Sequence, residues 1–279
     1  MSLKKRLAIK YIRAKFKLLS SLSKRNAAEQ ALQLFFTPQH RNKKKLPPIF
    51  EKAEKLHFSF EGETIRGYRW HPSPKKVLII HGFESSVINF DRYIQPLIKK
   101  GYEVLAFDAP AHGRSTGKII NALLYKSFLQ HIYKQYGPIQ SYIAHSLGGL
   151  ALSLFLEELK SDEPIKAVLI APATETTTAI DQAFDYIKLD KEVRKEFDLL
   201  IEEISGHSPE WFSIKRAVQH IDADILWIHD KDDNMTPYAD AQKVQQLQLP
   251  NIRFFITEGL GHRRIYRDAK IAQAVVDFL

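Results

Sequence analysis

The chain of 279 residues contains no cysteine and only two methionines. The lack of cysteine excludes disulfides, thiolate nucleophiles and cysteine-bearing metal sites. Apolar runs are short, and none approaches the roughly 20 residues that a helix needs to cross a bilayer. Lysines and arginines interrupt every apolar run near the N-terminus, so no signal peptide is predicted. These absences, together with 44% hydrophobic residues, predict a globular, cytoplasmic protein with one sizeable core.

The sequence also lacks the recognisable patterns of a metal site and of a dinucleotide-binding loop. Eleven histidines occur, but none stands in a His-x-x-x-His or His-Glu-x-x-His spacing, so we expect no metal site. The string "GLGHRR" at 259–264 lacks the third glycine of a dinucleotide-binding loop and contains a histidine instead. We therefore expect a protein that works without metal or cofactor.

Positive charge is concentrated in one segment. Residues 1–50 hold 13 lysines and arginines and the single acid Glu29, a net of +12, whereas the remaining 28 basic and 31 acidic residues give −3. Residues 3–36 are predicted to be helical, because Leu7, Tyr11, Leu18 and Leu22 recur at near-helical spacing between basic residues. The turn-rich string "TPQHRNKKKLPP" follows at 37–48. We predict a basic helical leader over 1–50.

Three partners are open for this leader. Its apolar stripe could pack on the body of the protein, or the helix could lie on an anionic membrane surface. A third alternative is the phosphate backbone of nucleic acid. Nucleic acid is the least favoured of the three, because no aromatic residues suited to base stacking are interleaved with the charges. The first two alternatives stay open, so a membrane-peripheral location is retained beside the cytoplasmic one.

The remaining chain predicts a three-layer α/β fold. The strings "LHFSF" and "TIRGYRW" alternate as strands around Glu61-Gly62-Glu63 and indicate an antiparallel hairpin. Runs that are apolar throughout then alternate with helical stretches, as in a mostly parallel sheet with helices on both faces. These runs are 77–81, 103–108, 141–145, 166–171, 224–229 and 252–257. The alternation stops at 172–219, where helical patterns follow one another, so we predict a core of 51–171 and 220–279 and a small helical lid at 172–219.

Chemically reactive residues follow the predicted strands, at the edge of the sheet where ligands bind in α/β proteins. The segment Ala144-His145-Ser146-Leu147-Gly148 lies between a strand and a helix and has the small-x-Ser-x-Gly form of a nucleophile elbow. A serine hydroxyl needs a base to accept its proton and a carboxylate to support that base. His262 and an aspartate of the string "HDKDDNMTP" at 229–237 can supply these groups.

The segment 56–279 resembles the α/β-hydrolase superfamily, since "HGF", "DAPAHGRS", "AHSLGG", "HDKDDNMTP" and "GLGHRR" occur in the order of that family. The resemblance implies an α/β-hydrolase fold with Ser146 as nucleophile and His262 as base. Similar family members have the pattern Gly-x-x-Asp-x-x-x-Pro here, with the acid four residues before the proline. Pro237 therefore favours Asp233 as the acid, with Asp232 as the alternative. The resemblance also implies two oxyanion-binding backbone N–H groups and four residues that shape the site. The oxyanion-binding N–H groups are those of Phe83 and Leu147. The residues that shape the site are His81, Gly82, His145 and Gly148.

We therefore expect a serine hydrolase that cleaves an ester-type bond through an acyl-enzyme. Aromatic residues in the predicted lid favour a small-molecule ester with an apolar portion, which would include a lipid-derived ester if the leader binds membrane. The same three residues also serve carbon–carbon bond hydrolases, amidases, thioesterases and peptidases, and the fold does not choose among them. A catalytically silent scaffold that binds a ligand or partner is the alternative from another class.

Overall fold

The computed structural model describes residues 3–42 and 44–279, so residues 1, 2 and 43 of the predicted leader lie outside the described residues. The chain forms two compact units. One contains the residues up to Thr37 together with Glu175–Phe212, and the other contains Pro38–Thr174 together with Ser213–Leu279. The predicted leader up to residue 37 and the predicted lid over 175–212 thus belong to one unit, while residues 38–50 of the leader and 213–219 of the lid belong to the other.

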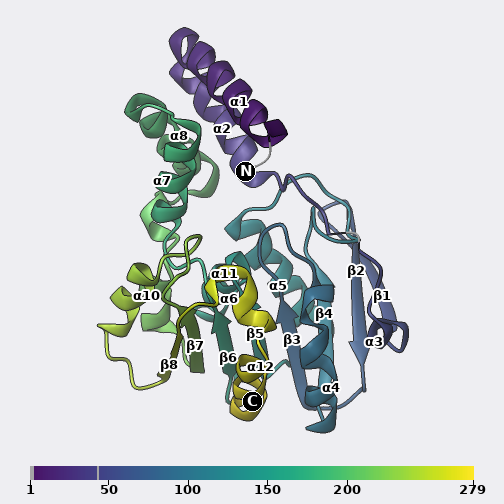
Figure 1. The fold of residues 1–279 in the computed structure, drawn as a ribbon. Helices are drawn as coiled ribbons and strands as arrows, with labels where there is room; N and C mark the ends of the chain where they lie inside the picture. Colours follow the sequence, from purple (N-terminus) through teal and green to yellow (C-terminus); the bar gives the residue numbers. More distant parts are fainter. Residues whose placement is uncertain (1–2, 43) are drawn as a thin grey trace. The chain divides into compact units, whose positions relative to one another are not determined.

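The larger unit is built on one sheet of eight strands (Figure 1). The order across the sheet is β1-β2-β4-β3-β5-β6-β7-β8. The pairs β1–β2 and β2–β4 are antiparallel, and every pair from β4–β3 to β7–β8 is parallel. The strands are β1 Glu54–Phe60, β2 Glu63–Trp70, β3 Lys76–Ile80, β4 Glu103–Asp108, β5 Ser141–His145, β6 Lys166–Ile170, β7 Asp224–Asp230 and β8 Ile252–Thr257. Each predicted apolar run coincides with one of the six later strands to within one residue at each end.

Burial explains why the two kinds of strand pattern differ. Strands β3 to β7 are covered on both faces and bury nearly every residue, whereas β1 alternates between exposed and covered positions. The β1–β2 hairpin turns at Glu61 and Gly62, whose φ values of 49° and 75° are both positive. Two successive positive φ angles match the right-handed twist of the strands, which is why this short connection closes the hairpin.

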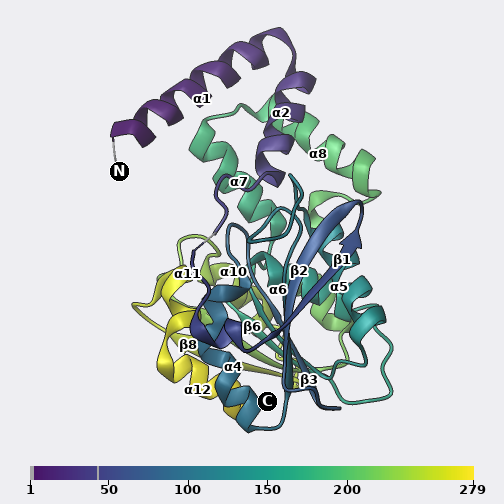
Figure 2. The same cartoon turned by 90° about the vertical axis from the view of Figure 1, so that its right-hand side faces the viewer.

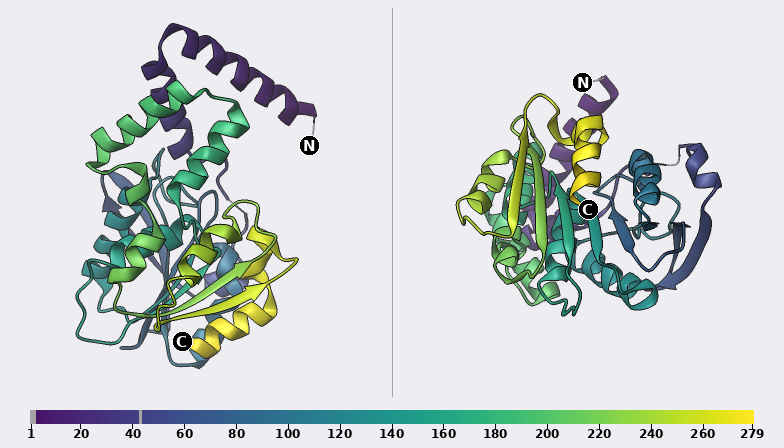
Figure 3. Two further views of the ribbon diagram at one scale, coloured as in Figure 1. Left: turned by 90° about the vertical axis from the view of Figure 1, so that its left-hand side faces the viewer. Right: turned by 90° about the horizontal axis from the view of Figure 1, so that it is seen from below.

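Helices cover both faces of this sheet, which confirms the predicted fold class (Figure 3). Helix α4 packs against α12, and α5 packs against α6; these two pairs lie on opposite faces of the sheet. The helices and 3₁₀ turns (η) of this unit are α3 Pro48–Glu51, η1 Val87–Phe90, α4 Asp91–Lys99, α5 Ala122–Tyr136, α6 Leu147–Leu156, α9 Ile214–Ala217, η3 Val218–His220, α10 Tyr238–Gln245, α11 Gly261–Arg264, η4 Ile265–Arg267 and α12 Ala269–Phe278.

The smaller unit is helical and consists of α1 Leu3–Leu22, α2 Lys24–Phe36, α7 Thr176–Ile187, α8 Lys191–Ser205 and the turn η2 Pro209–Trp211. The segment predicted to be helical over 3–36 consists of two helices, which meet near residue 23 (Figure 2). Ser23 has an extended backbone and its side chain accepts a hydrogen bond from the N–H of Asn26. A serine in this position caps a new helix, so the chain changes direction there.

Two aromatic residues of the predicted lid, Phe184 and Phe197, belong to the core of the smaller unit. Helix α2 packs against α8, and α1 contacts both α2 and α7. Phe197 is 1% exposed and meets Phe35 and Phe184 edge-to-face, with ring centroids 5.9 Å and 5.1 Å away. These rings therefore hold the unit together. Within the described residues, no helix combines the length and the apolar character that a membrane span requires.

Candidate active site

Ser146 occupies a strained turn between β5 and α6. Its φ and ψ are 56° and −125°, a conformation that costs a residue with a side chain about 1–3 kcal/mol. Close packing around the turn explains its small neighbours. A Cβ added to Gly148 would lie 2.5 Å from the carbonyl oxygen of His81, and one added to Gly82 would lie 2.7 Å from Cβ of Ser146. The predicted elbow geometry is thus present, and the loop at Gly82 passes directly beside Ser146.

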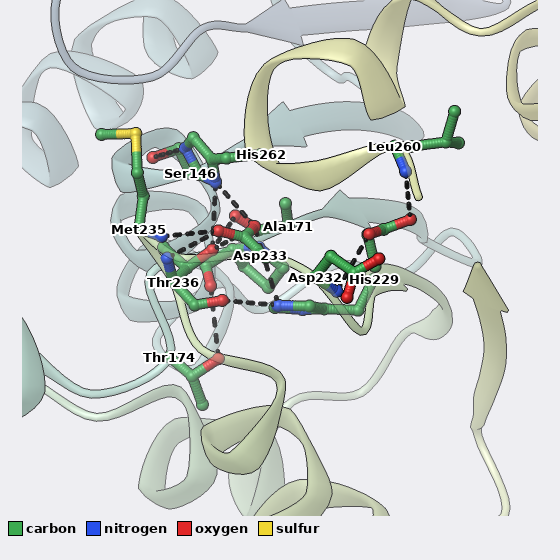
Figure 4. A network of polar contacts seen from close by, with 12 residues as sticks. Ser146, Ala171, Thr174, His229, Asp232, Asp233, Met235, Thr236, Leu260 and His262 are labelled. Carbon is green, nitrogen blue, oxygen red and sulfur yellow. Dashed lines mark hydrogen bonds and ion pairs between the residues drawn. The ribbon is translucent and has the colours of Figure 1, made fainter. Parts of the chain in front are cut away.

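Side chains from the turn at Ser146, from the loop after β7 and from the short helix α11 form one chain of hydrogen bonds (Figure 4). Oγ of Ser146 lies 3.1 Å from Nε2 of His262, and Nδ1 of His262 lies 2.8 Å from Oδ2 of Asp233. All three residues are buried, at 9% exposure or less. With Nδ1–H donating to the carboxylate, Nε2 is the basic nitrogen that faces the serine hydroxyl.

The structure separates the neighbouring aspartates that the sequence left as alternatives. Of the aspartates in this loop, Asp233 contacts His262, whereas Oδ2 of Asp232 accepts the backbone N–H of Gly259 at 2.9 Å. Oδ2 of Asp230 accepts the hydroxyl of Thr257 at 2.6 Å and the N–H of Leu260 at 3.0 Å. Asp230 and Asp232 therefore hold the loop that carries His262. Among the described residues, no group of three or more histidine, aspartate and glutamate side chains is arranged to hold a metal ion.

Asp233 is kept ionised by its surroundings. Burial alone would raise the pKa of this carboxyl, but the hydrogen bond and charge of His262 and the backbone N–H groups of Thr236 and Met235 hold the pKa below its ordinary value. These N–H groups donate to Oδ1 at 2.9 Å and 2.8 Å. A carboxylate with this set of donors is fixed in orientation as well as in charge.

Thr236 is a member of this network that sequence reasoning missed. Its hydroxyl lies 2.9 Å from Oδ2 of Asp233, 3.1 Å from Nδ1 of His262 and 3.2 Å from the carbonyl oxygen of Ala171. Its own carbonyl accepts a hydrogen bond from Nε2 of the buried His229 at 2.7 Å. A usable signal was the position of Thr236 three residues after Asp233, since an aspartate side chain commonly bonds backbone N–H groups at such offsets.

The predicted oxyanion donors Phe83 and Leu147 each adjoin a residue at the turn: Leu147 follows Ser146, and Phe83 follows Gly82. Leu147 is the first residue of α6, where a helix leaves its N–H groups without an internal acceptor. Phe83 follows Gly82, which contacts the serine directly. Neither N–H group donates a hydrogen bond to any other residue in the described part of the chain. Two such donors beside a reactive oxygen could stabilise negative charge on a substrate.

Buried neutral histidines tie the surrounding loops together. Nε2 of His81 accepts the N–H of Ala109 at 3.0 Å, and Nε2 of His112 accepts the N–H of Glu84 at 3.0 Å. These bonds join the loop after β3 to the loop after β4. His145 donates from Nε2 to the carbonyl oxygen of His262 at 3.1 Å, and so fixes the backbone that carries the base.

These histidines predict a loss of stability in mild acid. Burial lowers the pKa of His81 to about 4 and that of His112 to about 3, and holds that of His145 well below its ordinary value. The unfolded chain binds protons at these groups from about pH 6.5 downward, whereas the folded chain does not. The free energy of unfolding should therefore fall as pH drops from 6.5 towards 4, by about 1 kcal/mol per pH unit for each histidine. Urea denaturation across this range measures the slope, and a flat plateau between pH 7 and pH 5 would contradict it.

Comparison with known proteins agrees with this architecture. The sequence model for the family described as serine aminopeptidase, S33, matches residues 71–213, just over half of the chain. An uncharacterized protein of Bacillus subtilis strain 168, YqkD, is 24% identical over 237 residues, which covers 78% of this chain and 76% of YqkD.

Solved structures share the fold at low sequence identity. The Pyrococcus furiosus esterase Pf2001 superposes with a TM-score of 0.64 at 22% identity, covering 87% of this chain and 95% of the esterase. A putative lipase from Acinetobacter baumannii AYE gives 0.61 at 19% identity, covering 90% of this chain and 93% of that protein. With its elbow, its sheet order and this family match, the chain belongs to the S33 serine aminopeptidase-like hydrolases of the α/β-hydrolase superfamily.

Proposed function

We propose that this hydrolase cleaves carboxylic esters through an acyl-enzyme on Ser146. Nε2 of His262 takes the hydroxyl proton as Oγ of Ser146 attacks the acyl carbon, and Asp233 stabilises the imidazolium that forms. The N–H groups of Phe83 and Leu147 bind the resulting oxyanion. His262 then gives its proton to the departing alcohol, and a water activated by the same nitrogen releases the acid.

The observation that carries this proposal is the continuous hydrogen-bond chain from Ser146 to Asp233. The contact of 3.1 Å between Oγ and Nε2 is within proton-transfer range, and the contact of 2.8 Å on the other side of the ring selects the tautomer that can accept the proton. The positive φ of Ser146 supports the same role, because a strained turn persists only where the surrounding structure enforces it.

The state of the nearby carboxylates favours an ester over a peptide with a free amino terminus. An aminopeptidase needs a negative group that can pair with the substrate's ammonium. Asp108 instead accepts hydrogen bonds from Ser86, Val87 and Arg114. Glu84 accepts the N–H of Gln39 at 2.8 Å. The buried Asp108, with three donors, is therefore not free to pair with an ammonium, which supports an uncharged substrate over an aminopeptidase substrate.

Apolar side chains on the same loops support a substrate with an apolar portion. Phe83 is half-buried beside Gly82, and Met235, 50% exposed, lies two residues after Asp233. An exposed, unbranched methionine adapts to apolar ligands of different shape. The substrate class is therefore a small-molecule ester with an aliphatic acyl or alcohol group, lipid-derived esters included.

The test is covalent labelling followed by intact-mass measurement. A fluorophosphonate should add once to the parent protein and not at all to Ser146→Ala, because the probe reacts only with an activated serine. Ser153→Ala is the matched control, since Ser153 is buried in α6 and its hydroxyl donates to the carbonyl oxygen of Gly149; it should label like the parent.

A chain-length series of p-nitrophenyl esters, run beside aminoacyl p-nitroanilides, then separates ester from peptide substrates. Ester turnover that Ser146→Ala abolishes is the expected result. Absence of any adduct on protein that circular dichroism shows to be folded would overturn the proposal in favour of a silent scaffold. Labelling accompanied by faster anilide turnover would place the enzyme among the peptidases.

A further inference from the structure

Helix α1 carries two apolar faces, and only one of them is covered. Ile9 and Phe16 are buried, at 8% and 3% exposure, in the smaller helical unit. On the other side lies a set of large apolar side chains that we call the α1 stripe. It consists of Leu7, Tyr11, Leu18 and Leu22, exposed by 58%, 71%, 63% and 77%.

Helical geometry places the α1 stripe on one narrow face. At 3.6 residues per turn, these four positions fall within about 60° of the helix circumference. Exposed basic residues border the stripe on both sides, and we call them the α1 border. Arg6, Lys10 and Lys17 lie along one side and Lys15 lies along the other. Long basic side chains of this kind can keep their charges in a polar layer while their stems follow apolar groups inward.

The α1 border is not neutralised by its own unit. Other basic residues there are paired: Lys24 contacts Asp190 at 2.7 Å, and Arg25 pairs with Glu203. Among the described residues, by contrast, no carboxylate lies within ion-pair distance of any member of the border. Helix α1 itself contains no acidic residue. The exposed face therefore combines apolar surface with uncompensated positive charge.

We propose that this face of α1 binds the surface of an anionic lipid bilayer. The stripe enters the boundary between headgroups and acyl chains, and the border contacts the lipid phosphates. Other binding partners would match either the apolar stripe or the positive charges of this face, and not both. A second copy of the chain would bury the stripe but bring like charges together, and a nucleic acid would pair the charges but leave four large apolar side chains in water. The proposal stands independently of ester hydrolysis.

Sedimentation of the full chain with vesicles tests the proposal. Vesicles of phosphatidylcholine with phosphatidylglycerol should bind the protein, and vesicles of phosphatidylcholine alone should bind it far less. The double variant Leu7→Gln/Leu18→Gln should bind the anionic vesicles about tenfold more weakly or worse, because two apolar groups no longer leave water. The matched control is Leu199→Gln/Ile204→Gln, which changes two exposed apolar residues of α8 and should bind like the parent.

A charge variant keeps the test decisive if a stripe variant fails to fold. Lys10→Gln/Lys17→Gln should also weaken binding about tenfold, whereas Lys99→Gln/Lys270→Gln, exposed lysines of the other unit, should not. Thermal melting checks each variant's folding. Equal binding of parent and stripe variant would overturn the proposal. So would self-association that the stripe variant abolishes in protein that binds no vesicle, since the occupant would then be a second copy.

Discussion

His262→Ala is expected to lower kcat/KM for an ester substrate by at least about 10⁴-fold, a loss of about 5 kcal/mol of transition-state stabilisation. The side chain is the only one within hydrogen-bond distance of Oγ of Ser146 in the described residues. Without it the serine proton has no acceptor. Steady-state turnover and the rate of fluorophosphonate labelling should fall together, because both need the same activated oxygen.

The control for this variant is His220→Ala, at an exposed histidine in η3, which should keep parental rates. Retention of more than about one tenth of the parental kcat/KM by His262→Ala would contradict the proposed role, since removal of a general base typically costs far more. Labelling that persists at the parental rate would point to a different base.

Asp233→Asn is expected to cost about 10⁴-fold in kcat, with a smaller effect on KM. An asparagine at this position can present an N–H to Nδ1 of His262, and the ring then carries its proton on the nitrogen that faces Ser146. The base is thereby removed without a change of shape. Because the pKa of Asp233 lies below its ordinary value, titration of this carboxyl should not limit parental activity above about pH 4.

Asp232→Asn is the matched control one residue away. Its carboxylate contacts the N–H of Gly259 at 2.9 Å, and an asparagine carbonyl oxygen can accept the same bond. This variant should stay within a few-fold of the parent in kcat and in the pH profile. If Asp232→Asn were the more damaging change, the hydrogen-bond chain from Ser146 through His262 to Asp233 would not be the catalytic one.

Much of the larger unit was predictable, because the residue types within a single strand or turn already indicate its structure. A strand buried on both faces must be apolar throughout, so runs such as 103–108 and 141–145 identified β4 and β5 directly. The elbow was equally visible, since close packing at Gly148 demands a residue without a side chain. The helical pattern over 3–36 did not reveal the break at Ser23, where a capping hydrogen bond starts a second helix.

Only the tertiary structure shows which of several neighbouring residues belongs to the site. Asp232 and Asp233 are alike in type and adjacent in sequence, and only the loop geometry places one carboxylate 2.8 Å from His262 and the other against Gly259. Thr236 likewise joined the site through contacts with residues far along the chain, among them Ala171. Side-chain direction at a strand end depends on the turn that follows, which composition does not specify.

The sequence by itself determined the strands, the order of the reactive residues and the presence of a basic amphipathic leader. Tertiary structure decided which carboxylate meets the base, that the leader's helices share a unit with 175–212, and which face of α1 is covered. The physical reason is that periodicity reports which residues share a face of a helix. Whether that face is buried depends on partners that the chain supplies from more than 150 residues away, as when Arg13 binds the carbonyl oxygen of Tyr186.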